Sequence, residues 1–229
     1  MSYHFLNKQL YFPPIEEADE EGIVAIGGDL STERLLLAYK SGIFPWFSPG
    51  DPIVWWSPDP RFVLYPEKIK ISKSMKQLFK KQSFKVSLDL CFEDVITNCS
   101  AIRRKGQEGT WITNEMKKAY QKLHKLGYAH SVEVWQEDNL VGGLYGVALG
   151  RCFFGESMFS KVSNASKYGF ITLVQALREK GFKMIDCQVY TEHLESLGAE
   201  LVERRRFKEE LEKATTEPSI EGNWSSWLE

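Results

Sequence analysis

Three side chains in the second half of the chain have the types and surroundings that could support chemistry: Glu156, Asp186 and Gln188. Glu156 follows Gly155 within a run of phenylalanine and methionine residues, and Asp186 interrupts an otherwise apolar segment. Moving a carboxylate out of water is costly unless a cation or a hydrogen-bond donor meets it. Glu156 therefore lies either at the rim of a strand or beside the positively charged group of a ligand.

The spacing of these residues indicates how they could meet. Asp186 and Gln188 are two positions apart, so in a strand their side chains lie on one face. If the strands expected at 151–160 and 182–189 are neighbours, Glu156 approaches that pair. Two carboxylates and an amide in an apolar cleft can hold one ammonium group, deprotonate another amine and polarise a carbonyl group.

No motif indicates an activated nucleophile or a metal site. The chain contains no GxSxG sequence, and neither Cys152 nor Cys187 has an obvious histidine partner. His124 and His130 have no third ligand in their neighbourhood of the sequence. The four cysteines include no CxxC pair, which is typical of free thiols in a reducing cytoplasm. We expect direct transfer to an amine, with no metal and no cofactor.

The hydrophobic pattern predicts the elements that must position these groups. Alternating apolar residues indicate strands, and a 3.6-residue period after a capping residue indicates helices. We expect helices capped by Ser31, Ser72, Thr113 and Asn164, strands at 23–26, 129–135, 140–149, 151–160 and 182–189, a short helix at 192–198 and an edge segment at 199–207. The tail ends in Trp224 and Trp227, so we expect it to dock on the protein.

Residues 43–60 form a segment rich in tryptophan and proline. Proline fixes the backbone and removes a donor, so we expect stiff, irregular chain there rather than regular secondary structure. Large rings on such a chain make a wall for a flat ligand such as a nucleic-acid base. We assign Trp55 and Trp56 to the core and Trp46 to the ligand.

Residues 68–85 contain seven lysines and no acid. A helix that begins after Ser72 would carry Lys73, Lys76 and Lys80 on one face. A solvated helix face normally mixes charges of both signs, whereas a face of one sign is typical of a polyphosphate site. The pattern therefore favours a nucleic acid as a partner.

The composition sets limits on the class of protein. The chain has 229 residues, 43% of them hydrophobic and 26% charged, and a formal net charge of −2. These values exclude a wholly basic coat for nucleic acid but allow a local basic patch. No apolar run approaches the length of about 18 residues that a membrane span requires. The N-terminus lacks the pattern of a signal peptide, so we expect a cytoplasmic protein.

Seven motifs, in this order, carry a resemblance to a known family: Gly27–Ser31, Gly42–Phe47, Trp55–Arg61, Gly109–Thr113, Phe154–Ser160, Asn164–Lys167 and Ile185–Gln188. Together they resemble the leucyl/phenylalanyl-tRNA–protein transferase family over roughly residues 10–207. The resemblance implies an α/β (α+β) fold. A small N-terminal α/β domain, residues 1–62, would precede an acetyltransferase-like (GNAT-like) domain, residues 63–229, with a mixed, mainly antiparallel sheet flanked by helices.

The resemblance also implies an activity. Members of the family transfer leucine or phenylalanine, and methionine weakly, from aminoacyl-tRNA to the N-terminal arginine or lysine of an acceptor protein. The transfer marks the acceptor for degradation by the N-terminal rule. The partners expected from the resemblance are therefore aminoacyl-tRNA and such proteins, with no membrane, and we expect a monomer.

Site roles follow from the matching motifs. Trp46 and Trp111 would clasp the terminal adenosine of the tRNA, and Glu156 would hold the α-amino group of the aminoacyl moiety. Asp186 and Gln188 would order and activate the attacking amine. The side-chain pocket would be lined by Leu144, Phe153, Phe170, Leu173, Leu177 and Ile185, and the tRNA phosphates would be met by Lys73, Lys76, Lys80 and Lys81.

Strict alternation along the strands conflicts with part of this assignment. It places Phe153 and Ile185 on the opposite faces from Glu156 and Asp186. A β-bulge or a splaying of the two strands would reconcile the two sets.

Two other functions fit parts of the pattern. An acetyl-coenzyme A N-acetyltransferase would share the order of strands and helices, but its pyrophosphate needs a glycine-rich turn before the helix. Residues 160–166 contain no glycine. A non-catalytic RNA-binding module would use the tryptophans and lysines and leave the acids structural. Tight binding of acetyl-CoA would favour the first function, and tRNA binding without transfer would favour the second.

Overall fold

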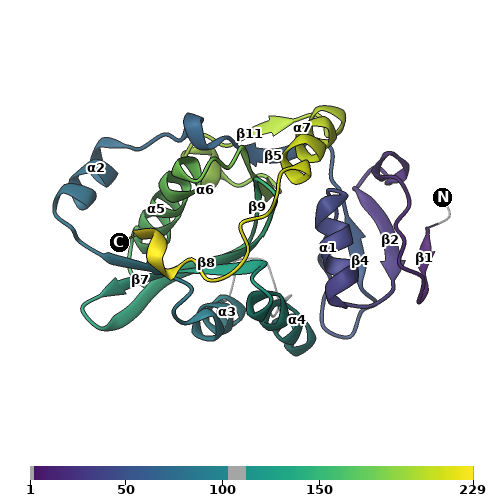
Figure 1. Ribbon diagram of the computed structural model, residues 1–229, viewed down its shortest axis with the longest axis horizontal. Coiled ribbons are helices and arrows are strands. Elements are labelled where there is room, and N and C mark those ends of the chain that lie inside the picture. The colour runs from purple at the N-terminus through teal and green to yellow at the C-terminus, as the bar shows by residue number, and fades with distance from the viewer. Residues whose placement is uncertain (1–2, 103–111, 229) are drawn as a thin grey trace.

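Two β-sheets organise the protein, as the computed structural model shows in Figure 1. The structure describes residues 3–102 and 112–228, so Trp111 lies outside the described residues. The smaller sheet has the strand order β1-β2-β4-β3. Its strands are β1 (Phe5–Leu6), β2 (Ile23–Gly27), β3 (Phe44–Pro45) and β4 (Val54–Trp56), and helix α1 (Thr32–Lys40) lies between β2 and β3 in the chain.

The prediction of irregular chain for residues 43–60 is wrong at both ends of that segment. Strands β3 and β4 pair with each other there, with Phe44 opposite Trp56 and Pro45 opposite Trp55. Pro45 is tolerated because β3 is an edge strand, where a missing backbone donor costs no ladder bond.

The larger sheet has seven strands in the order β11-β5-β10-β9-β8-β7-β6. Their bounds are β5 (Arg61–Leu64), β6 (Lys85–Leu88), β7 (Ala129–Gln136), β8 (Asn139–Leu149), β9 (Cys152–Ser160), β10 (Met184–Gln188) and β11 (Glu200–Val202). The pair β9–β10 is parallel and the other neighbouring pairs are antiparallel. The expected mixed, mainly antiparallel sheet is therefore confirmed.

Strand β5 shows where the chain passes from one sheet to the other. Strand β4 of the small sheet ends at Trp56, a short turn follows, and β5 begins at Arg61. Strand β5 then pairs with β10 and β11 of the larger sheet. The domain boundary that we predicted after residue 62 falls within this strand, and the division into two domains stays a prediction.

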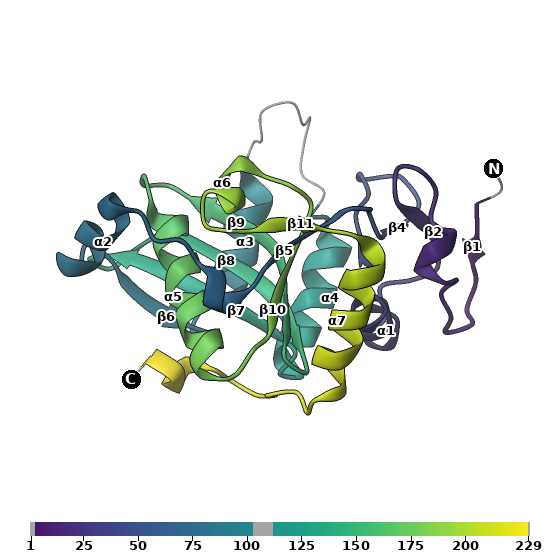
Figure 2. The same ribbon diagram turned by 90° about the horizontal axis from the view of Figure 1, so that it is seen from above.

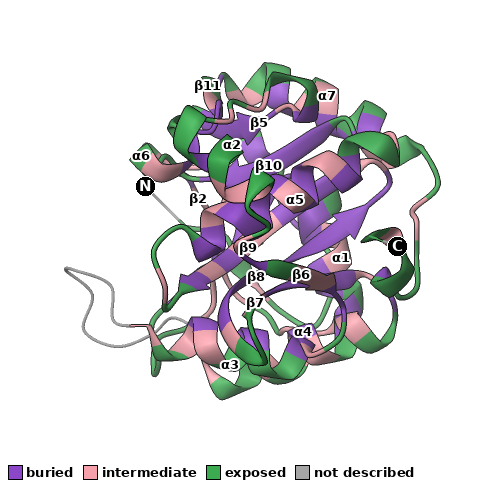
Figure 3. Cartoon of the chain, turned by 90° about the vertical axis from the view of Figure 1, so that its left-hand side faces the viewer, coloured by how far each residue is buried: buried purple, intermediate pink, exposed green. Residues whose placement is uncertain are grey.

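Helices cover both faces of the larger sheet (Figures 1 and 3). The helices are α2 (Lys73–Lys80), α3 (Phe92–Ala101), α4 (Asn114–Lys125), α5 (Ala165–Glu179), α6 (Glu192–Glu195) and α7 (Arg204–Thr216). α5 packs with α2 in one buried cluster, whereas α1, α3, α4 and α7 contribute to a second cluster on the opposite face. In the part of the chain that the structure describes, no helix is long and apolar enough to cross a membrane.

The predicted helix starts can be checked against the capping hydrogen bonds in the structure. The side chains of Ser31, Ser72 and Thr113 each accept a hydrogen bond from a backbone N–H in the first turn of the helix that follows, so these three caps are confirmed. Asn164 does precede α5, but its side chain makes no capping bond. Its φ of +67° places it instead in the left-handed region, which asparagine tolerates better than most residues.

Helices α3 and α7 and strands β1, β5 and β6 were not predicted from the sequence. The segment 199–207, expected to be an edge, does contain the edge strand β11, but α7 begins at Arg204. Three arginines occupy the first turn, where positive charge is unfavourable for the helix dipole, so the sequence gives no signal for a helix start there. The apolar stripe of Phe207, Leu211 and Ala214 compensates, since all three residues are buried.

The C-terminal strap, residues 217–228, crosses the molecule after α7 (Figure 2). Trp224 is only 1% exposed, and its ring stacks on His130 with centroids 3.4 Å apart. Its backbone N–H donates to Asp89 Oδ2 at 2.9 Å. The prediction that the tail docks is therefore confirmed.

Candidate active site

A cavity of about 460 Å³ lies where strands β9 and β10 part from each other. Their parallel pairing ends at Asp186 opposite Phe154, while β9 continues to Ser160. A bulge also interrupts the pairing of β8 with β9: Tyr145 faces Ser157, the next residue of β8 faces Gly155, and Glu156 is left without an opposite residue. The bulge and the splayed strands that alternation required are therefore both present.

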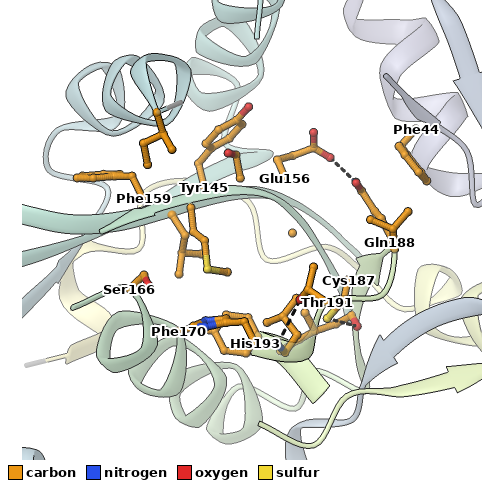
Figure 4. A pocket seen from close by; sticks show the side chains of 18 of the residues that line it. Phe44, Tyr145, Glu156, Phe159, Ser166, Phe170, Cys187, Gln188, Thr191 and His193 are labelled. Atoms are coloured by element: carbon orange, nitrogen blue, oxygen red, sulfur yellow. Dashed lines mark hydrogen bonds between the residues drawn. The ribbon is translucent and has the colours of Figure 1, made fainter. Parts of the chain in front are cut away.

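The wall of the cavity comes from several elements (Figure 4). Strand β3 of the small sheet contributes Phe44, and Trp46 follows directly after that strand. Helices α5 and α6 contribute Phe170 and His193. Most of the wall is apolar, and Glu156 and Gln188 face each other at one end. Both the volume and the mixture of apolar wall and few polar groups are typical of a small-molecule site.

Glu156 forms hydrogen bonds with three side chains. Gln188 Nε2 and the hydroxyl of Tyr39 lie 2.7 Å and 2.8 Å from Oε1, and the hydroxyl of Tyr120 lies 3.0 Å from Oε2. The two tyrosine hydroxyls are also hydrogen-bonded to each other. Burial raises the pKa of Glu156 to about 7, because the three donors offset only part of the cost of desolvating the carboxylate.

Tyr39 and Tyr120 are site residues that sequence reasoning missed. Both occupy apolar positions of their helices, and both rings are fully buried, so their spacing indicated core packing and nothing more. Only the tertiary structure brings α1 and α4 together over the bulge in β9. Burial raises the pKa of both hydroxyls well above the ordinary value for tyrosine.

Asp186 is paired rather than open to the cavity. Its carboxylate accepts two hydrogen bonds from Arg61, from Nε at 2.8 Å and from Nη2 at 2.7 Å, and both side chains are at most 1% exposed. The guanidinium group lies between the rings of Phe44 and Phe207, 4.7 Å from each centroid. A buried bidentate pair of this kind fixes geometry strongly.

Gln188 is held by Asp186. Its backbone N–H donates to Asp186 Oδ1 at 2.9 Å, and its φ of +64° is one that a residue other than glycine rarely adopts. The pairing of β10 with β5 shifts register between these two residues. The predicted neighbourhood of Glu156, Asp186 and Gln188 is present, but of the two β10 residues only Gln188 borders the cavity.

Trp46 borders the cavity and is 38% exposed. The indole N–H of Trp56 donates to its carbonyl oxygen at 2.7 Å, and the two rings lie 5.7 Å apart. Trp55 is fully buried, as expected, whereas Trp56 is only partly buried.

The six residues expected to line the side-chain pocket divide into two groups. Leu144, Phe170 and Ile185 border the cavity. The other three, Phe153, Leu173 and Leu177, lie in the same buried cluster but do not border it. Met158 and Phe159 form part of the wall and were not predicted to do so.

Four lysines of the basic segment lie on α2 or directly after it. Lys73, Lys76, Lys80 and Lys81 are all exposed. Met75 anchors the helix to the core, and Phe79 stacks on Tyr168 of α5 with ring centroids 3.9 Å apart. The apolar stripe therefore faces the protein and leaves the lysines to solvent.

The fold and the site together define a class: a mixed α/β protein with a largely apolar cavity that carries a carboxyl group and an amide at one end. Comparison with known proteins agrees. The family model described as leucyl/phenylalanyl-tRNA protein transferase matches residues 63–212, and the model of that family's N-terminal domain matches residues 28–59.

Curated relatives carry the same name. Leucyl/phenylalanyl-tRNA–protein transferase of Syntrophus aciditrophicus is 56% identical over 96% of this chain and 92% of its own length. The protein of that name from Flavobacterium johnsoniae is 60% identical over 89% of this chain and 96% of its own length. The chain belongs to the leucyl/phenylalanyl-tRNA–protein transferase family, and it is an aminoacyltransferase.

Solved structures share only part of the arrangement. An aminoglycoside acetyltransferase from an uncultured soil sample matches 48% of this chain and 80% of its own, with 17% identity and a TM-score of 0.37. The L-PGS structure from Bacillus licheniformis matches 68% of this chain and 51% of its own, with 15% identity and a TM-score of 0.38.

Proposed function

We propose that the protein transfers leucine or phenylalanine, and methionine weakly, from aminoacyl-tRNA to the N-terminal arginine or lysine of acceptor proteins. The transfer would mark these acceptors for degradation by the N-terminal rule, in the cytoplasm. The observation that carries the proposal is the cavity itself, with an apolar wall, Glu156 and Gln188 at one end and the exposed Trp46 at its edge.

Three parts of an aminoacyl-adenosine can be assigned to groups that border the cavity. The apolar side chain would pack on Leu144, Phe170 and Ile185, and the α-amino group would meet Glu156. The ring of Trp46 offers a stacking surface for the terminal adenine, a contact worth about 1–3 kcal/mol. Trp111, the second ring expected at the adenosine, lies outside the described residues.

The chemistry needs little beyond positioning. An aminoacyl ester is already activated, so bringing an amine against its carbonyl carbon removes much of the barrier. The neutral amine attacks the carbonyl carbon directly, and a C–N bond forms as the ester C–O bond breaks. One proton of the amine passes to the departing oxygen, which leaves as the 3′-hydroxyl of the tRNA, without a covalent enzyme intermediate. We assign Gln188 to the attacking amine, and Asp186 to holding Gln188 and Arg61 in place.

The expected selectivity follows from the wall. Because the wall is apolar, it accepts leucine and phenylalanine, whereas it discriminates against methionine only weakly, since one methylene group is worth roughly 1–3 kcal/mol. The phosphates of the tRNA would be contacted by Lys73, Lys76, Lys80 and Lys81.

Incubation with radiolabelled leucyl-tRNA and an arginine-initiated peptide tests the proposal. We expect the label to move to the peptide, and an N-acetylated copy of the peptide, which lacks a free amine, to remain unlabelled. A protein that bound leucyl-tRNA and left the label on it would be an RNA-binding module instead. Transfer of an acetyl group from acetyl-CoA to the same peptide would support the acetyltransferase alternative.

A further inference from the structure

Three oxygen-bearing groups beside the cavity form a closed ring of contacts. The hydroxyl of Tyr39 on α1 contacts Glu156 Oε1 at 2.8 Å, and the hydroxyl of Tyr120 on α4 contacts Glu156 Oε2 at 3.0 Å. The third side of the ring is the hydrogen bond between the two hydroxyls. Each group therefore touches both of the others.

Counting protons shows what this ring requires. A tyrosine hydroxyl supplies one proton, and an ionised carboxylate supplies none. With Glu156 ionised, two protons serve three contacts, and one pair of oxygens meets without a proton between them. With Glu156 protonated, three protons serve three contacts and each contact is a hydrogen bond. Ionising Tyr39 or Tyr120 would only deepen the shortage, and burial opposes it by raising the pKa of both.

Among the residues that the structure describes, the groups around Glu156 do not compensate the charge of its ionised form. Gln188 Nε2 donates to Oε1 at 2.7 Å but is neutral. Arg61, from the neighbouring strand β5, is occupied by Asp186, whose own charge disfavours a second carboxylate nearby. Within residues 3–102 and 112–228, the other titratable groups around the ring or in the cavity wall are Tyr145 of β8, Cys187 of β10 and His193 of α6. Burial lowers the pKa of His193 and so favours its neutral form.

We propose that the ligand-free site holds Glu156 as a carboxylic acid and that the α-ammonium group of the aminoacyl donor displaces its proton. The Glu156 O–H bond breaks, the proton leaves to solvent, and an N–H of the ammonium group then donates to the carboxylate. This exchange rests on the proposed function, since it assigns the cation to the aminoacyl donor. The raised pKa of Glu156, about 7, agrees with a protonated resting state.

The exchange makes Tyr39 and Tyr120 positioning residues for donor recognition. They stabilise the empty site in a neutral form, so that a carboxylate appears only when a cation is present to meet it. A donor whose α-amino group is acylated carries no cation and could not complete the exchange. The site should therefore reject N-blocked aminoacyl esters.

The resting state can be tested without a ligand. In protein labelled with ¹³C at the glutamate carboxyl carbon, the Glu156 resonance, assigned by its loss in Glu156→Gln, should titrate with a midpoint near pH 7. In Tyr120→Phe the ring is open: the protonated form loses two neutral hydrogen bonds, and the ionised form loses one charge-assisted bond, which is worth about twice as much. The two losses nearly cancel, so the midpoint should move by less than about half a unit. Loss of a tyrosine that merely donated to a carboxylate would instead raise the midpoint by more than that.

A matched control is Tyr65→Phe. It removes another hydroxyl that donates to a carboxylate, Glu210 Oε2 at 2.5 Å, away from the cavity. It should leave the Glu156 midpoint unchanged. A midpoint near the ordinary value for glutamate in the parent protein, or an upward shift of more than about half a unit in Tyr120→Phe, would overturn the shared-proton ring.

Calorimetry tests the exchange itself. The probe is adenosine that carries leucine in amide linkage at the 3′ position, titrated at pH 6 in buffers of different ionisation enthalpy. We expect release of close to one proton per molecule bound, and none with the analogue that has hydrogen in place of the amino group. Binding without proton release would overturn the exchange alone. Failure of the probe to bind would overturn the proposed function and the exchange together. The ligand-free titration would still test whether Glu156 shares a proton with the two tyrosines.

Discussion

Arg61 and Asp186 are the pair on which the geometry of the site depends. The pair links β5 to β10, and Asp186 in turn accepts the backbone N–H of Gln188. Because Arg61 also lies between the rings of Phe44 and Phe207, it ties the cavity wall at β3 to helix α7. A bidentate pair in which both side chains are buried fixes the geometry around it.

Removing Arg61 should be costly. Arg61→Met leaves the carboxylate of Asp186 buried without its partner, which should lower the free energy of unfolding by about 3–5 kcal/mol. Adding Asp186→Asn to that variant removes the stranded charge and should recover part of the loss. Urea denaturation of the three proteins measures both effects. If the double variant were no more stable than Arg61→Met, unpaired charge would not be the cause.

Glu156 should make stability depend on pH with a defined sign. Its pKa in the folded protein is about 7, above the ordinary 4.5, so the folded state retains a proton that the unfolded chain loses. The stabilisation is complete below pH 4.5 and is lost as the pH rises through 7. Glu156→Gln should therefore gain stability relative to the parent between pH 4.5 and pH 8, by on the order of 3 kcal/mol. Thermal or urea unfolding across this range, with Glu212→Gln at an exposed position as control, measures the gain. A gain that is the same at pH 4.5 and pH 8 would contradict it.

At the scale of elements, α2 separates two tasks between its faces. Met75, Leu78 and Phe79 hold the helix to α5 and the core, and the lysines are left exposed. Among the described residues, Lys73, Lys76 and Lys80 form no ion pair with an acid. A set of unpaired cations on one anchored helix suits the phosphate backbone of a tRNA.

The α2 lysines should set the salt dependence of tRNA binding. Replacing Lys73, Lys76 and Lys80 by alanine should reduce the log–log slope of affinity against salt by roughly 0.7–0.9 for each lost phosphate contact. The matched control replaces three exposed lysines on one face of α4, Lys118, Lys122 and Lys125, and should leave the slope as it was. Filter binding across a range of salt concentrations gives both slopes. A change confined to the control would place the tRNA on α4.

At the scale of the whole molecule, the C-terminal strap closes the core on the side of β6 and β7. Trp224 stacks between His130 and Trp227, with centroid distances of 3.4 Å and 4.0 Å. Asp89 accepts hydrogen bonds from the backbone of Trp224 and Ser131 and contacts His130 at 2.8 Å. None of the described strap residues borders the cavity, and we expect the strap to contribute to stability rather than to the reaction.

Loss of the Trp224 ring should destabilise the protein without changing its chemistry. Trp224→Ala should lower the free energy of unfolding by about 3–5 kcal/mol, because a fully buried ring leaves a cavity. Trp227→Ala, at a half-buried position, should cost less. Urea denaturation compares the two, and the rate of transfer at saturating leucyl-tRNA should match the parent while the variant is folded. A larger loss in Trp227→Ala, or a slower reaction in folded Trp224→Ala, would assign the strap another role.

Local patterns in the sequence were enough to predict most elements and the candidate residues. Ser31, Ser72 and Thr113 mark helix starts because a hydroxyl beside a free backbone N–H acts within four residues. Alternating apolar residues likewise predicted strands β7 to β10, and the spacing of Asp186 and Gln188 placed them together. The start of α7 was not predicted, because arginines in the first turn are unfavourable for the helix dipole. Burial of Phe207 and Leu211 outweighs that local effect.

Only the tertiary structure decided how those residues are used. Tyr39 and Tyr120 lie 117 and 36 positions from Glu156, and Arg61 lies 125 positions from Asp186. Residue spacing within one element cannot predict contacts between residues so far apart in the sequence. The bulge at Glu156 and the parting of β9 from β10 likewise depend on the neighbouring strands. Sequence determined which groups could react. Long-range packing determined which carboxylate is paired and which one faces the cavity. The reason is that the hydrogen-bond and ion-pair partners of each carboxylate come from elements that meet only when the chain folds.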